Sequence, residues 1–203
     1  MIQELVLATR NRHKAEELVA LLRGLGIQVH TLDEFPQVPE VVEDGQTCEA
    51  NAIKKAKAVA AATGMLAVAD DTGLEVDALG GRPGVYAARY AGEHATYEDN
   101  WRKLLKELAG VPSARRTAKF ITVAAMANPS GDVQIAQGTL DGFIAETPSG
   151  EQGFGYDPVF VVPELGKTLA DISADQKNRI SHRAKAFAKV RGLLETVWSR
   201  EFV

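Results

Sequence analysis

Two long runs of strand-forming residues in the middle of the chain constrain the fold more than any other feature of the sequence. They cover residues 117–127 and 133–146, and a Pro-Ser-Gly-Asp turn at residues 129–132 separates them. Two such runs around a short turn predict a β-hairpin. Because the strands of a hairpin are antiparallel, we expect part of the sheet to be antiparallel.

Strand and helix patterns alternate along the rest of the chain, which favours an α/β fold with helices on both faces of a sheet. Short apolar runs predict strands at residues 4–8, 27–31, 66–69 and 159–162. Apolar stripes at helical spacing, together with capping residues, predict four helices. The first helix follows residues 9–14, and the second begins at Thr47 and ends near Gly64. The third runs from Thr96 to Gly110, and the fourth begins at Ser181. Residues 32–46 and 80–84 are expected to be irregular.

The composition is that of an ordinary globular protein, with 45% apolar and 25% charged residues in a chain of 203. No linker of disordered composition divides the chain, so we expect a single domain, residues 1–203, with two lobes. Cys48 is the only cysteine, which excludes an intrachain disulfide and fits a reducing compartment.

Charge and hydropathy argue against two classes of partner. The net charge of −4 lacks the basic excess that a nucleic-acid clamp needs. No apolar run approaches the roughly 20 residues of a membrane span, and Glu4 stands where a signal peptide would be basic. We therefore expect a cytoplasmic protein that binds neither a nucleic-acid polymer nor a membrane.

The first candidate site is the polar segment 9–14, between an expected strand and an expected helix. A helix N-terminus offers free backbone N–H groups, and Lys14 adds a full positive charge, so the segment suits a triphosphate. A capped surface helix with unrelated cations is the alternative. The segment is not a Walker A loop, whose Gly-x4-Gly-Lys-Ser/Thr pattern is absent from the chain.

The second candidate site is the acidic pair Asp70-Asp71, expected just after a strand. Adjacent side chains on a strand point to opposite sides, so one of the two would face a given site. Carboxylate oxygens there suit Mg²⁺, which takes one or two carboxylates together with substrate phosphates. Glu43 could be a second ligand or a water-activating base. A turn stabilised by its own backbone is the alternative.

The third candidate site is the Gly-rich loop Gly-Phe-Gly-Tyr-Asp-Pro at residues 153–158. Glycines let a ligand approach the backbone, Phe154 or Tyr156 offers a stacking face, and Asp157 offers an acceptor. The alternative is a tight turn with core aromatics. The Gly-x-Gly-x-x-Gly fingerprint of dinucleotide binding is absent.

The fourth candidate site is Ser181-His182-Arg183, preceded by Lys177. Adjacent residues on a helix diverge by about 100°, so Ser181 is better explained as a helix cap than as a nucleophile beside His182. The alternative is a capped helix with exposed cations. The four histidines and one cysteine show no zinc-like spacing.

Together and in this order, the segments resemble the inosine/xanthosine triphosphate pyrophosphatase family. The matching pieces run from residue 8 to residue 183 and are Ala8-Thr9-x-Asn11-x-x-Lys14, Val42-Glu43-Asp44-Gly45-x-Thr47, Asn51-Ala52-x-x-Lys55-Ala56, Ala69-Asp70-Asp71-Thr72-Gly73-Leu74, Leu79-Gly80-Gly81-x-Pro83-Gly84, Ala88-Arg89-Tyr90, Gly153-Phe154-Gly155-Tyr156-Asp157-Pro158, Lys177 and Ile180-Ser181-His182-Arg183. The chain departs from the family at Cys48 and Ala50, where the family usually has Phe and Glu.

The resemblance implies an elongated α/β/α fold with a long twisted mixed sheet and two lobes around a central active cleft, usually in a homodimer. It implies hydrolysis of ITP, dITP and XTP to monophosphate and pyrophosphate with Mg²⁺, which cleans the nucleotide pool. The alternatives are a pyrophosphatase of the same fold with another base preference and a nucleotide sensor without turnover.

The resemblance also implies roles for individual residues. Glu43 and Asp71 would bind Mg²⁺ or order the attacking water, with Asp71 as the catalytic proton acceptor. Substrate would be bound by residues from all four segments and the helix after Thr47, namely Thr9, Arg10, Asn11, Arg12, His13, Lys14, Lys55, Thr72, Phe154, Gly155, Tyr156, Asp157, Lys177, His182 and Arg183. Within this set, the phosphates would be held by Thr9, Asn11, Lys14 and Lys55. Phe154 would stack on the purine, and the base would be faced by Lys177, His182 and Arg183.

Overall fold

The computed structural model describes residues 3–200 and contains a mixed sheet whose strands follow the order β2-β1-β3-β5-β6-β7-β8, with β4 paired to β3. The strands are β1 (Glu4–Leu7), β2 (Gln28–Thr31), β3 (Ala67–Val76), β4 (Pro83–Gly84), β5 (Thr117–Ala127), β6 (Val133–Ile144), β7 (Phe160–Val162) and β8 (Lys167–Thr168). Strand β1 runs parallel to β2 and β3, whereas β7 runs antiparallel to β6 and β8. The predicted α/β class with a partly antiparallel sheet is confirmed.

Five α-helices accompany the sheet in the described part of the chain. They are α1 (Arg12–Leu22), α2 (Cys48–Thr63), α3 (Tyr97–Glu107), α4 (Ala174–Ile180) and α5 (His182–Arg200). Short 3-10 helices lie at Leu32–Glu34, Asp77–Leu79, Ala87–Arg89, Ser113–Arg115 and Leu169–Asp171. None of the helices in residues 3–200 combines the length and apolar character needed to cross a membrane.

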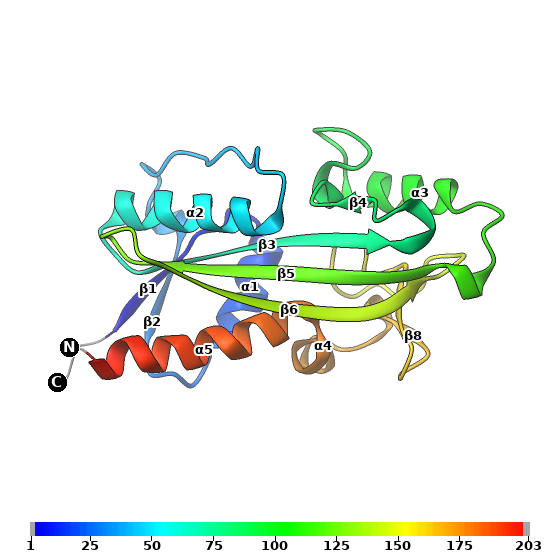
Figure 1. Ribbon diagram of the computed structural model, residues 1–203. Helices are drawn as coiled ribbons and strands as arrows, with labels where there is room; N and C mark the ends of the chain where they lie inside the picture. The colour runs from blue at the N-terminus through cyan, green and yellow to red at the C-terminus, as the bar shows by residue number, and fades with distance from the viewer. Residues whose placement is uncertain (1–2, 201–203) are drawn as a thin grey trace. The chain divides into compact units, whose positions relative to one another are not determined.

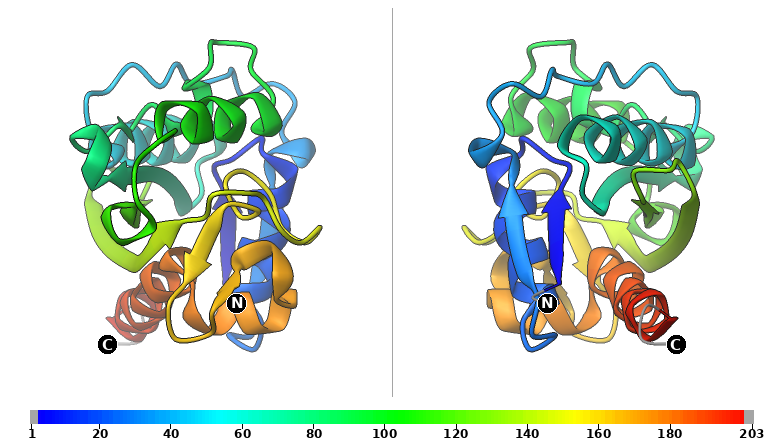
Figure 2. Two further views of the ribbon diagram at one scale, coloured as in Figure 1. Left: turned by 90° about the vertical axis from the view of Figure 1, so that its right-hand side faces the viewer. Right: turned by 90° about the vertical axis from the view of Figure 1, so that its left-hand side faces the viewer.

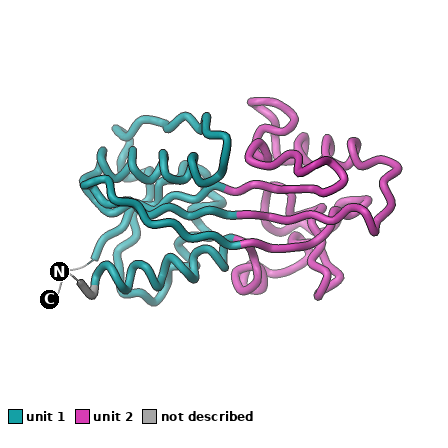
Figure 3. The backbone as a smooth tube through the Cα atoms, viewed as in Figure 1, with its two compact units in different colours: residues 1–71, 122–138, 183–203 teal, residues 72–121, 139–182 magenta. Residues whose placement is uncertain are grey.

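The chain divides into two compact units (Figure 3). Unit 1 comprises residues 1–71, 122–138 and 183–203, and unit 2 comprises residues 72–121 and 139–182. The predicted central cleft and the prediction of a single domain stay predictions.

Unit 1 is built around an apolar cluster to which β1, α1 and α5 contribute. Leu5, Leu18, Phe187 and Leu194 are all almost completely buried in it. Helix α2 lies on the other face of the strands from α5 (Figure 1). Because α2 begins at the cap Thr47, whose side chain accepts from the Ala50 N–H, and ends at left-handed Gly64, its predicted bounds are confirmed.

Unit 2 has its own apolar cluster, with Leu74, Leu104 and Phe160 fully buried. Helices α3 and α4 lie on opposite sides of its strands (Figures 1 and 2). The capping box predicted at Thr96 and Asp99 is present at the start of α3.

Three sequence predictions about local structure were wrong or incomplete. Strand β3 does not end before Asp70 but continues to Val76, so the acidic pair lies inside the strand and not in a turn. Residues 80–84 are not wholly irregular, because Pro83 and Gly84 pair with β3. Helix α4 was not predicted: Ser173 caps it, and Ser181, its final cap, lies directly before α5.

Candidate active site

The polar segment 9–14 joins β1 to α1 and carries the local hydrogen bonds of a helix start. Asn11 is the N-cap of α1, since its Oδ1 accepts from the Lys14 backbone N–H at 3.2 Å. Thr9 accepts the Asn11 N–H through Oγ1 at 3.2 Å. Lys14 therefore lies in the first turn of α1 and takes part in the cap through its backbone N–H and not through its side chain.

Lys14 and Arg183 meet at the carboxylate of Asp70. Lys14 Nζ lies 3.2 Å from Asp70 Oδ2, and Arg183 Nε donates to the same oxygen at 3.2 Å. Asp70 is completely buried, and burial alone would raise its pKa. Lys14, Arg183 and Lys55 outweigh burial and hold the pKa of Asp70 below its ordinary value. Asp70 is therefore ionised.

Glu17 completes this buried ion network. Its Oε2 accepts from Arg183 Nη1 at 2.6 Å. Arg183 is 2% exposed and spans two carboxylates that come from α1 and β3. The alternative of exposed cations does not hold for Arg183, which is an interior residue of unit 1, nor for Lys177, which is 4% exposed.

Asp71, the neighbour of Asp70 on β3, has a different set of partners. Its Oδ2 accepts from Asn51 Nδ2 at 3.1 Å, and its Oδ1 lies 3.7 Å from Lys55 Nζ. Lys55 Nζ also donates to Glu43 Oε1 at 3.0 Å. Lys55 therefore brings the two predicted metal-binding carboxylates, Glu43 and Asp71, to one ammonium group. We call Glu43, Asn51, Lys55 and Asp71 the carboxylate cluster.

The pKa of Asp71 is shifted in the opposite direction to that of Asp70. Burial raises the pKa of Asp71, Lys55 and Lys14 lower it, and the nearby charge of Glu43 raises it, with a net upward shift. A buried carboxylate with a raised pKa binds a proton more readily than an ordinary surface aspartate, which suits a proton acceptor. The same carboxylates raise the pKa of Lys55 against the effect of its burial, so Lys55 stays charged.

Cys48 lies at the first position of α2, beside the carboxylate cluster. Burial and the charge of Asp71 raise the pKa of its thiol to about 12. The thiol is therefore protonated at neutral pH and is a poor nucleophile. At this position, where the usual family pattern has Phe, the chain therefore carries a small and neutral side chain.

The aromatic loop, residues 153–158, forms a second cluster in unit 2. Asp157 Oδ2 accepts from the Phe154 backbone N–H at 2.9 Å and from Lys177 Nζ at 2.5 Å. Lys177 Nζ also lies 4.7 Å from the centre of the Phe154 ring. A Cβ atom at Gly153, whose φ is +74°, would stand 2.0 Å from Asp157 Oδ2, so this turn requires glycine. Asp157 thereby fixes both Phe154 and Lys177.

Unit 2 contains further aromatic contacts. The Tyr97 ring lies 5.8 Å from Phe154, and both rings are partly exposed. Tyr156 is buried and donates to the Ala87 carbonyl at 2.8 Å, so it supports the loop from within. Gly155 adopts a φ of +65°. His182 is buried against Phe120, with ring centres 4.4 Å apart and nearly parallel planes.

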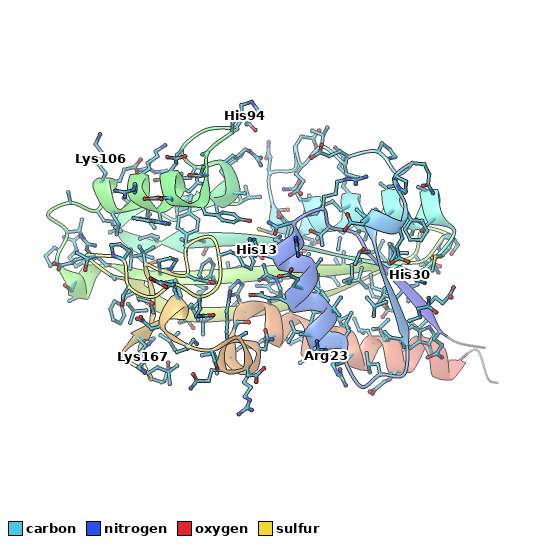
Figure 4. All side chains as sticks on the ribbon, turned by 180° about the vertical axis from the view of Figure 1, so that it is seen from behind. His13, Arg23, His30, His94, Lys106 and Lys167 are labelled. Carbon is cyan, nitrogen blue, oxygen red and sulfur yellow. The ribbon has the colours of Figure 1, made fainter. Side chains whose placement is uncertain are left out.

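The remaining predicted residues stand nearer the surface. Arg10 donates to the Val38 carbonyl, and Arg12 is exposed and paired with Glu16 at 3.0 Å. His13 is exposed in the first turn of α1, where Figure 4 labels it. Thr72 is half-buried in β3 and belongs to unit 2.

Sequence reasoning missed Asn51 and Glu17 as parts of these networks. Asn51 precedes Lys55 by four residues on α2, and Glu17 follows Lys14 by three on α1. Residues at those spacings share a helix face. Helical spacing from a predicted site lysine is thus the signal that could have found both.

The donor set of the carboxylate cluster fits a magnesium ion. It offers carboxylate oxygens, which are the ligands that Mg²⁺ prefers, and Mg²⁺ commonly keeps waters and substrate phosphates as its other ligands. Within residues 3–200, no group of three or more His, Cys, Asp or Glu side chains is arranged to hold a metal. An all-protein zinc or calcium site is therefore not supported by this part of the chain.

Comparisons with known proteins agree with the resemblance seen in the sequence. A family model described as the Ham1 family matches residues 5–193. A protein of Shouchella clausii named dITP/XTP pyrophosphatase is 47% identical over 98% of this chain and 100% of its own length. One of Geobacillus kaustophilus with the same name is 50% identical over 93% of each chain. The structure of a HAM1 protein from Coxiella burnetii superposes with a TM-score of 0.87 and 40% identity, covering 96% of this chain and 100% of that one.

Proposed function

This chain belongs to the Ham1 family, and from that premise we propose that it hydrolyses deaminated purine nucleoside triphosphates to monophosphate and pyrophosphate. The substrates would be ITP, dITP and XTP, and the biological role would be to clean the nucleotide pool. Relatives that carry the name dITP/XTP pyrophosphatase match nearly the whole chain, which supports this activity for the full protein.

The observation that carries the proposal is that the adjacent residues Asp70 and Asp71 have different partners and opposite pKa shifts. The first is ionised and enclosed by Lys14 and Arg183, and the second has a raised pKa and lies among Lys55, Glu43 and Asn51. Binding alone needs no proton acceptor placed beside a second carboxylate. Hydrolysis does, because water must lose a proton as it attacks phosphorus.

Unit 1 would bind the triphosphate. Lys14 at the start of α1 and Lys55 on α2 supply positive charge, and the N-terminus of α1 supplies backbone N–H groups. These groups neutralise the charge that opposes attack on the α-phosphorus. Asp71 would accept the proton of the attacking water.

Glu43 and Asp71 would hold the divalent cation, for which we propose Mg²⁺. When bound, the ion would supply further charge neutralisation at the phosphates. Lys55 now occupies the position between the two carboxylates, at 3.0 Å and 3.7 Å. The Lys55 ammonium group between two carboxylates supports a preference for positive charge at this place.

Unit 2 would bind the base. Phe154 offers a stacking face that accepts any purine, and Lys177 beside it offers a donor. Hypoxanthine and xanthine have an acceptor oxygen at C6 where adenine has a donor amine. A fixed donor of this unit, such as Lys177 or His182, would therefore favour the deaminated bases, because adenine would leave a donor facing a donor.

The decisive experiment incubates the purified protein with ITP, XTP, GTP, ATP and dUTP, with Mg²⁺ or with excess chelator. We expect ITP to yield IMP and pyrophosphate when Mg²⁺ is present, and no reaction in excess chelator. Release of IDP and orthophosphate, or full activity in chelator, would contradict the proposal. A preference for GTP or dUTP would instead support a pyrophosphatase of the same fold with another base preference.

We also propose that the protein is a cytoplasmic homodimer, as the family resemblance implies. The free nucleotide pool is the substrate, and neither a membrane nor a nucleic-acid polymer is required as a partner. Light scattering at micromolar concentration tests the assembly: a stable particle of the 21.8 kDa chain mass would contradict the dimer.

A further inference from the structure

A buried amide lies between the loop that carries Glu43 and the carboxylate of Asp71. Asn51 is 1% exposed and uses both ends of its side chain. Its Oδ1 accepts from the Gly45 backbone N–H at 2.8 Å, and its Nδ2 donates to Asp71 Oδ2 at 3.1 Å. One side chain thus connects a loop, a helix and a strand.

The orientation of this amide is fixed by the chemistry of its partners. The Gly45 N–H can only donate, so it requires the oxygen of the amide on its side. The nitrogen must then face Asp71, which as a carboxylate can only accept. A flipped amide would set donor against donor at one end and acceptor against acceptor at the other. The arrangement therefore has one stable state.

Fixing one oxygen of Asp71 also determines where the other oxygen points. With Oδ2 on Asn51, Asp71 Oδ1 faces Lys55 at 3.7 Å, on the side that Glu43 also shares through the same ammonium group. Glu43 stands two residues before Gly45 in the sequence. The bond to Gly45 therefore restrains the segment that presents Glu43.

Gly45 shows how closely this contact is built. A Cβ atom at residue 45 would lie 2.5 Å from Asn51 Oδ1 and 3.0 Å from Ala50 Cβ. The φ of Gly45 is not in the left-handed region, unlike that of Gly64 or Gly153. The close approach to Asn51, and not backbone conformation, is what requires glycine here.

We propose that Asn51 is a positioning residue that sets the rotation of the Asp71 carboxylate and holds the Glu43 loop against it, with Gly45 providing the room. Asn51 would touch neither substrate nor metal. This inference rests on the proposed function, because it assigns Asn51 a part in presenting the proton acceptor of that reaction.

The most informative variant is Asn51→Asp, which keeps the acceptor for Gly45 and replaces the donor to Asp71 by an oxygen. We expect kcat for pyrophosphate release from ITP to fall by about 10- to 100-fold, because small misplacements of a catalytic group cost rates of that order. KM should stay within about threefold, because the phosphate-binding lysines are unchanged. Hydrogen exchange of the Gly45 amide should remain slow.

Asn51→Ala removes both contacts and should lower kcat at least as much, while the Gly45 amide exchanges faster. Gly45→Ala should lower kcat by displacing the same amide, although residue 45 offers no side chain to the substrate. Asn51→Ala and Gly45→Ala act through one contact, so the variant that combines them should have a kcat no lower than that of the slower single variant. Gly192→Ala, on α5 with nothing within 4 Å of the new Cβ, is the control and should behave as wild type.

These outcomes separate the inference from the function on which it rests. A wild-type protein that releases no pyrophosphate from any nucleotide defeats the proposed function. An active wild type with Asn51→Asp at wild-type kcat overturns the inference alone. So do fully multiplicative losses in the double variant. Thermal melting of each variant, with kcat measured well below the transition, keeps loss of folding from imitating loss of positioning.

Discussion

Arg183 donates to Asp70 in an interior where neither side chain reaches solvent: their side chains are 2% and 0% exposed, and Nε lies 3.2 Å from Oδ2. Breaking a buried pair by removing one partner strands the other charge, which typically costs about 3–5 kcal/mol. Arg183→Met should lower the free energy of unfolding by about that amount, because Asp70 keeps Lys14 but loses its second cationic partner, and Glu17 loses the Arg183 donor. Urea denaturation measures it.

Arg12→Met is the matched control, because the Arg12 side chain is 89% exposed in its pair with Glu16. An exposed pair contributes about 0–1 kcal/mol, so this variant should unfold close to wild type. Equal losses in the two variants would contradict a structural role for the Arg183 network. The ratio of kcat/KM for ITP and ATP in Arg183→Met also tests the sequence prediction that Arg183 reads the base.

Asp70 and Asp71 should respond differently to the same substitution. Asp71→Asn keeps the shape of the side chain and removes the proton acceptor, so kcat for ITP should fall by about 10²–10⁴-fold while the protein stays folded. Asp70→Asn removes the charge that Lys14 and Arg183 share and should mainly lower stability. Parallel measurement of kcat and melting temperature compares them. An Asp71→Asn enzyme within about threefold of wild type would refute its catalytic role.

Phe154→Ala should weaken binding without changing base preference. An aromatic face stacks on any base, and base–aromatic stacking is typically worth about 1–3 kcal/mol. KM should therefore rise for ITP and ATP by similar factors, with kcat less affected. Tyr97→Ala, which removes the ring 5.8 Å from Phe154, is the companion variant. A change in the ITP/ATP ratio in Phe154→Ala would place base selection in the loop.

Tyr90 should give the protein a stability change in alkaline solution. Burial and the hydrogen bond to Glu107 raise the pKa of Tyr90 to about 12. The ordinary value is about 10, so the neutral hydroxyl stabilises the fold below that pH. This contribution should be lost as pH rises from about 10 to about 12.

Denaturant unfolding at about pH 9 and about pH 11 checks this sign. Tyr90→Phe has no hydroxyl to titrate, so its stability should fall less than that of wild type between the two conditions. An equal fall in both proteins would assign the change to other groups. Ultraviolet absorbance of tyrosinate follows the ionisation directly.

The elements that local signals define could be predicted from the sequence. Strand β5 matches its predicted bounds, and the start and end of α2 follow from the cap Thr47 and from Gly64. Each of these signals lies within a few residues of the feature that it predicts. The bounds of β3 could not be predicted in this way, because its polar residues resemble a turn.

What makes those polar residues suitable for a strand is contact with distant segments. Asp70 is neutralised by Lys14 and by Arg183, which lies 113 residues later in the chain. Asp71 is satisfied by Asn51, 20 residues earlier. A single sequence shows none of these pairings. For the same reason the resemblance gave the site residues as a set, and the structure showed that Arg183 faces two carboxylates within unit 1.

The position of the acidic pair inside β3 also limits how this gene segment can evolve. A one-residue shift along a strand exchanges the two faces on which its side chains lie. Inserting or deleting one residue between β1-paired Ala67 and Asp70 would turn one carboxylate toward the partners of the other. Substitutions at these positions can be graded in their effect, but a change of length cannot. Natural variation in this stretch should therefore preserve its residue count even where the amino acids differ.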